Sequence, residues 1–160
     1  DPEHAPAPVG RICARVLAPR ATVDRDVLIG ALNELLSAER AGAQVAVASL
    51  KEATGVLQRE LLQQVHRGEA DSCRRLRDCL LLLGAEPSRE RGAFYEKCMA
   101  IADLGERLAL VDRGQKWVIR KLVALLDVVV HPRIREELQA VLQTHEVNSD
   151  DYVAKADALG

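Results

Sequence analysis

Four polar residues of types that bind metal ions or share protons interrupt apolar stripes of the sequence. They are Glu39, Glu69, Gln115 and His145. A carboxylate inside a protein core is costly unless it is protonated, paired with a cation or bound to a metal ion. Two carboxylates and an imidazole that converge between helices form a typical site for iron or manganese. These residues are therefore the first candidates for a metal-binding or proton-sharing site.

The stripes that hold these residues predict four long helices. Their apolar positions recur at intervals of three and four residues, which places them on one face of a helix. We expect helices over about 24–52, 56–83 and 133–159, and a further one that begins near Ile101 and ends at "DVVVHP". Gly84 is a typical helix stop, and proline suits the first turn of the last helix.

Four helices with one apolar stripe each predict an all-α four-helix bundle. Each polar interruption falls near the middle of its stripe. Because the midpoints of antiparallel helices lie at one level, we expect the four interruptions to form a single polar layer inside the core. Three glycines stand beside this layer, where they leave space for a ligand or allow close helix approach: Gly42, Gly68 and Gly114.

The same layer also fits an internal network of salt bridges and hydrogen bonds that needs no metal. Such a network can fix the register of a bundle. Three arginines lie near enough in the helical pattern to neutralise Glu39 or Glu69: Arg40, Arg107 and Arg113. Residue types and spacing leave the metal site and the metal-free network open as alternatives.

Three stretches of the chain resemble the ferritin-like superfamily, and more specifically an uncharacterised bacterial ferritin-like family. They are "LNELLSAERAGAQVA", "GAFYEKCMAIADLGERLALVDRGQKWVIRKL" and "LQTHEVN", and the resemblance covers roughly residues 25–159. It implies a four-helix bundle whose second and third helices run in the same direction. Residues 84 to about 100 would then form a crossover along the length of the bundle, with room for one short helix.

The metal ligands of that superfamily are a Glu on helix 1, Glu-x-x-His on helix 2, a Glu on helix 3 and Glu-x-x-His on helix 4. Glu39, Glu69 and His145 match this pattern, whereas Ser72 replaces a histidine and Leu142 replaces a glutamate. The resemblance thus implies a reduced or atypical site for iron or manganese, with redox or oxygen chemistry. Candidate additional ligands are His66, Asp112 and Gln115. The alternative is a metal-free bundle that acts as an interaction or accessory protein.

Composition excludes several other classes of protein. The net charge is −2 with both signs interspersed, and only four residues are aromatic, so nucleic acid is not an expected partner. The longest apolar run is far too short to span a membrane. None of the four cysteines forms a Cys-x-x-Cys pair, and we expect a reducing, cytoplasmic setting. A charged face on the third helix could contact a second copy of the chain or another protein.

The sequence divides into two parts. Residues 1–22 hold four of the six prolines, and "DPEHAPAPVG" predicts an extended arm or linker. Residues 23–160 hold all the predicted helices and form the expected bundle domain.

Overall fold

The computed structural model describes residues 22–159, so the predicted arm lies almost entirely outside the described residues. This part of the chain contains five α-helices and no strand, which confirms the prediction of an all-α protein. None of the helices combines the length and the apolar character needed to cross a membrane. The helices are α2 (Arg25–Leu50), α3 (Val56–Leu82), α4 (Phe94–Met99), α5 (Leu104–Leu126) and α6 (Pro132–Leu159).

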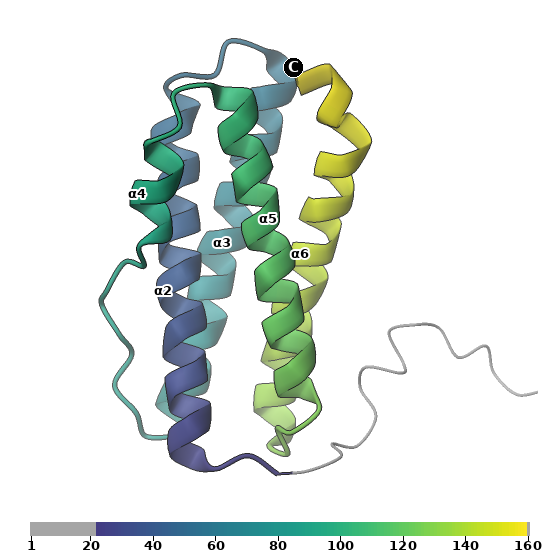
Figure 1. The fold of residues 1–160 in the computed structure, drawn as a ribbon. Helices are drawn as coiled ribbons and strands as arrows, with labels where there is room; N and C mark the ends of the chain where they lie inside the picture. Colours follow the sequence, from purple (N-terminus) through teal and green to yellow (C-terminus); the bar gives the residue numbers. More distant parts are fainter. Residues whose placement is uncertain (1–21, 160) are drawn as a thin grey trace, which may run out of the picture.

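The four long helices lie alongside one another (Figure 1). Helix α2 packs against α3, α3 against α6, and α6 against α5, whereas α2 and α5 make fewer direct contacts. Figure 1 shows α3 and α5 running in the same direction, with the chain between them returning along the side of α2. The short helix α4 contacts both α2 and α5 on this side.

The returning segment is held against α2 by hydrogen bonds at several positions along that helix. The backbone N–H of Ser88 donates to Asn33 Oδ1 at 2.8 Å, and the backbone N–H of Gly92 donates to the carbonyl of Ser37 at 3.3 Å. Arg91 Nη1 donates to Gln44 Oε1 at 2.7 Å, still further along α2. The segment therefore follows α2 toward its C-terminal end and places α4 beside it.

A buried arginine fixes the start of α5. Arg107 is 3% exposed, and its guanidinium donates to the carbonyl of Ile101, to Ser49 Oγ and to the carboxylate of Glu52. The hydrogen bond from Arg107 lowers the pKa of Glu52. Helix α5 begins at Leu104 rather than near Ile101, because Asp103 accepts the backbone N–H of Glu106 and caps the helix.

The apolar core has two parts. One contains Leu32, Leu36, Leu80, Leu122 and Leu138 among others, and the second contains Val45, Leu62, Val65, Leu108 and Val111 among others. On each long helix the members of the two clusters are separated by a stretch of chain that holds one of the four polar interruptions.

Helix α3 ends in a Schellman motif at the predicted stop. Gly84 has a φ of +70°, the backbone N–H of Ala85 donates to the carbonyl of Leu80 at 2.9 Å, and the N–H of Gly84 donates to the carbonyl of Leu81 at 3.0 Å. Only a residue without a side chain adopts this left-handed conformation at no steric cost.

Gly84→Ala is expected to lower the free energy of unfolding by about 1 kcal/mol, because in the left-handed region the Cβ atom of alanine lies too close to the following carbonyl oxygen. In a chain of this size that loss lowers the melting temperature by about 2–4 °C. Thermal unfolding followed by circular dichroism measures it. Gly84→Asn is the matched control and should lose less, since asparagine tolerates this conformation. Equal stability of Gly84→Ala and the wild type would contradict the expectation.

Candidate metal centre

The structure brings the four polar interruptions together between the two apolar clusters. Glu39 comes from α2, Glu69 from α3, Gln115 from α5 and His145 from α6. All four side chains are buried, and Glu39 has no exposed surface. The predicted polar layer is therefore present, with one residue from each long helix.

Glu39, Glu69 and His145 form a compact group. His145 Nε2 lies 2.7 Å from Glu39 Oε1 and 3.7 Å from Glu69 Oε2. One potential ligand atom from each of the three residues lies within 4.8 Å of the other two. The contact between Glu39 and His145 is short, but it is not a hydrogen bond. Both Glu39 oxygens and His145 Nε2 consequently have no hydrogen-bond partner among the described residues.

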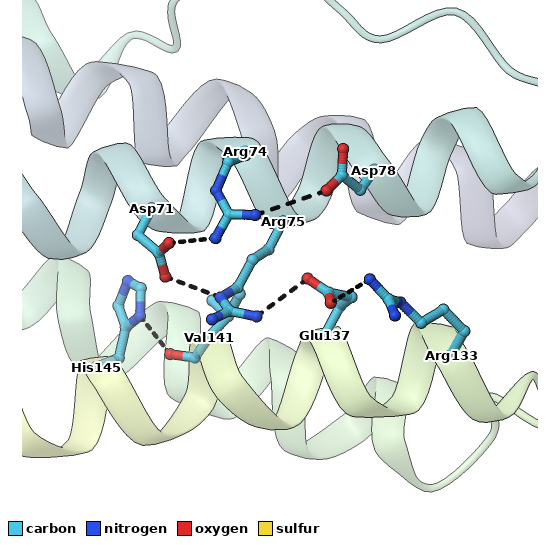
Figure 2. A network of polar contacts seen from close by, with 8 residues as sticks. All are labelled: Asp71, Arg74, Arg75, Asp78, Arg133, Glu137, Val141 and His145. Atoms are coloured by element: carbon cyan, nitrogen blue, oxygen red, sulfur yellow. Dashed lines mark hydrogen bonds and ion pairs between the residues drawn. The ribbon is translucent and has the colours of Figure 1, made fainter.

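The tautomer of His145 follows from its second nitrogen. Nδ1 lies 2.8 Å from the backbone carbonyl of Val141, one turn earlier on α6 (Figure 2). A carbonyl oxygen only accepts, so Nδ1 carries the proton and donates it. In a neutral imidazole Nε2 then presents a lone pair toward Glu39. Metal-binding histidines are oriented by the same kind of hydrogen bond from the nitrogen that does not bind the ion.

A network of ion pairs ties α6 to α3 beside His145 (Figure 2). Arg75 on α3 donates to Asp71 at 2.8 Å and reaches Glu137 on α6 at 3.3 Å. Glu137 is also paired with Arg133 at 3.3 Å. Partial burial opposes ionisation of Asp71, but hydrogen bonds from Arg75 and Arg74 hold its pKa below the usual value. The network fixes the segment of α6 that precedes His145.

The carboxylate of Glu69 is oriented by two neighbours. Gln115 Nε2 donates to Glu69 Oε1 at 2.6 Å, so the amide of Gln115 contacts the group through its nitrogen. Gly42 faces the same carboxylate, and a Cβ atom built at Gly42 would lie 2.8 Å from Glu69 Oε1. The missing side chain at Gly42 thus provides the space that Glu69 occupies. The other two glycines face Asn148 and Thr144 on α6 and the ring of Phe94 on α4.

The arginines expected to neutralise this layer are engaged elsewhere or lie at the surface. Arg40 Nη1 donates to the carbonyl of Glu90 at 2.6 Å, and Arg107 is bound at the start of α5. Arg113 is exposed. Within residues 22–159, Glu39 and Glu69 form ion pairs only with His145. The salt-bridge form of the metal-free network, with arginine as the cation, is therefore absent from the described part of the protein.

Two of the candidate additional ligands lie outside the group. Asp112 is buried, but it accepts from Ser149 Oγ at 2.8 Å and pairs with Lys116 at 3.0 Å. His66 is half-buried on α3 and is not part of the cluster. Ser72 and Leu142, which occupy the positions of a missing histidine and a missing glutamate, are both buried.

The cysteines in the described region are free thiols and poor ligands. Cys73, Cys79 and Cys98 form no disulfide there. Burial, reinforced by the charge of Glu69, raises the pKa of Cys73 to about 11. Burial also raises the pKa of Cys79 to about 12. Because the thiolate is the form that binds metals, these values leave the carboxylates and the imidazole as the donor set.

Reasoning from sequence missed two contributions to the group. The carbonyl of Val141 holds His145, and the i−4 relation of the two residues on one helix was the available signal. The amide nitrogen of Gln115 donates to Glu69, and its Oε1 is buried without a hydrogen-bond partner among the described residues.

The donor set fits a divalent ion of borderline or hard character. Carboxylate oxygens and a neutral imidazole suit manganese, iron and zinc. Two carboxylates and one dication together carry no net charge, which removes the main cost of burying them. Three buried donor atoms without hydrogen-bond partners are also what an ion would satisfy.

The fold and this group define a helical protein with a buried carboxylate–histidine cluster that could hold a metal ion. Residues 26–157 match the family described as Domain of unknown function (DUF6306), and the chain belongs to that family. No curated protein and no solved structure matches the chain.

Proposed function

We propose that this chain is a ferritin-like four-helix bundle that binds a single iron or manganese ion through Glu39, Glu69 and His145. The arrangement of α3 and α5, which run the same way with a returning segment between them, supports the ferritin-like topology. Single occupancy follows from the donor set, because three of the six ligands that a di-metal site uses are present. A bound iron or manganese ion would supply one-electron redox or oxygen chemistry.

The proposal rests on the burial of Glu39 and on its lack of hydrogen-bond partners. Glu39 has no exposed surface, its two oxygens have no hydrogen-bond partner, and among described residues no Arg or Lys side chain pairs with it. An ionised carboxylate in this position is uncompensated unless a cation occupies the group. The other residues of the layer have supporting roles. Gln115 orients Glu69, and the carbonyl of Val141 keeps His145 Nε2 free for the ion.

A metal-free bundle that acts as an interaction or accessory protein is the second candidate. It is favoured by the 2.7 Å contact between Glu39 and His145, which a single shared proton could hold together. The hydrogen bond from Gln115 to Glu69 would complete such a network. We also propose that the protein is cytoplasmic and that it forms a homodimer or binds another protein.

Metal content and thermal stability test the proposal directly. Protein purified without tags or chelators should contain iron, manganese or zinc at less than one ion per chain and saturate near one. An ion that binds only the folded state at a concentration 100 times its Kd adds about 2.7 kcal/mol to the free energy of unfolding. The melting temperature should therefore rise by about 5–10 °C. If none of the three ions changes the melting temperature, the metal-free alternative holds.

A further inference from the structure

A cavity of about 620 Å³ lies between α2 and α5, beside α4. Cavities that hold small molecules measure about 300–1,000 Å³. Glu69, one residue of the candidate metal centre, lines this cavity together with Gly42. The cavity thus reaches Glu69 from the side of the molecule where α4 is packed.

The walls of the cavity are apolar. The residues that line it include Phe94, Leu110, Val111, Trp117 and Val118. The ring of Phe94 lies against Gly114, where a Cβ atom would be only 2.8 Å from Cζ of the ring. A ligand that fills this space must therefore present an apolar body to α4 and α5.

Three cations gather among the residues that line the cavity: Lys97, Arg113 and Arg120. All three are exposed, and within residues 22–159 none of their side chains has an ion-pair partner. Glu34 also lines the cavity but is paired with Lys121 at 3.5 Å. Among the described residues, Glu34 and Glu69 are the acidic ones that line this cavity. Its surface therefore combines an apolar interior with unpaired positive charge.

We propose that this cavity binds a small amphipathic carboxylic acid. Its carboxylate lies against Arg113 and Arg120, whose guanidinium groups are suited to paired hydrogen bonds with a carboxylate. Its apolar body enters between Phe94 and Trp117 and ends near Glu69. The second half of this inference, that the buried end of the acid meets a metal ion, rests on the proposed function. A small amphipathic carboxylic acid is thus the class of substrate that we propose for the candidate metal centre.

Trp117 is the single tryptophan of the chain and reports binding by its fluorescence. The probes are octanoate, octanol and octylamine, added below their micelle concentrations to protein stripped of metal with a chelator. Octanoate should bind saturably and at least about tenfold more tightly than the other two, because only its head group is complementary to the arginines. Equal binding of octanoate and octanol, or no saturable binding of octanoate, would overturn the proposal.

The double variant Arg113→Ala/Arg120→Ala should bind octanoate about tenfold or more weakly and bind octanol as the wild type does. Both arginines are exposed, so the variant should fold, and circular dichroism verifies this. Arg67→Ala is the matched control, since Arg67 is an exposed arginine of α3 outside this cavity. Unchanged octanoate affinity in the double variant would place the carboxylate elsewhere and refute the proposed orientation.

Protein loaded with Mn²⁺ separates this inference from the proposed function. Octanoate should change the electron paramagnetic resonance spectrum of bound Mn²⁺ in the wild type and not in the double variant. An unchanged wild-type spectrum, with octanoate bound, would show that the acid does not reach the ion. If the protein binds octanoate selectively but takes up no metal, the proposed function fails and the acid-binding cavity stands. If it binds metal and no octanoate, the reverse holds.

Discussion

Glu39→Gln is expected to abolish metal uptake while leaving the melting temperature of the metal-free protein unchanged or raised. The substitution keeps the shape of the side chain and removes one negative charge from a fully buried position. In the metal-free protein this relieves the repulsion between Glu39 and Glu69. The new amide can also donate to His145 Nε2, which presents a lone pair because Nδ1 donates to Val141.

Metal analysis and melting curves with and without chelator measure both parts of this expectation. Glu60→Gln is a suitable control, because Glu60 is an exposed glutamate on α3 and should change stability by less than about 0.5 kcal/mol. If Glu39 and His145 form a charged pair without metal, the substitution strands a buried cation at a cost of about 3–5 kcal/mol. A melting temperature lowered by roughly 6–20 °C, whether or not chelator is present, would end the metal hypothesis.

Gly42→Ala is expected to weaken metal binding by about 10–100-fold while the protein remains folded. The added methyl group would lie 2.8 Å from Oε1 and 2.9 Å from Cδ of Glu69. The carboxylate is the flexible end of its side chain, so it moves away at little cost and leaves its position beside Gln115. Disturbing the neighbours that orient a metal ligand typically costs 10–100-fold in affinity.

The matched control for this substitution lies on the same helix. Gly30 is exposed in α2, and a Cβ atom built there has nothing within 4 Å. Gly30→Ala should raise the free energy of unfolding by about 0.5–1 kcal/mol through helix propensity alone, with metal affinity unchanged. Titration of both variants with Mn²⁺ compares them. Equal affinity in the two variants would show that the space at Gly42 is not needed by the site.

Helix positions and the composition of the polar layer could be predicted from the sequence. Helix α3 begins at Val56 as expected, and Gly84 ends it in the left-handed conformation that glycine favours. Glu39, Glu69, Gln115 and His145 meet because each occupies the buried face of its own helix near the midpoint. Periodicity determines which face of a helix is buried, and helix length determines the level at which residues on neighbouring helices meet.

Only the tertiary structure decided which partner each polar side chain has. Arg40 follows Glu39 directly in sequence, yet it turns to the carbonyl of Glu90 because the segment before α4 is packed against that side of α2. Asp112 lies one turn from Gln115, but Ser149 and Lys116 hold it away from the group. Helical spacing gives the direction in which a side chain leaves its helix and does not specify what the neighbouring element offers there. The cavity beside Glu69 also depends on where α4 packs, and no local pattern in the sequence encodes that contact.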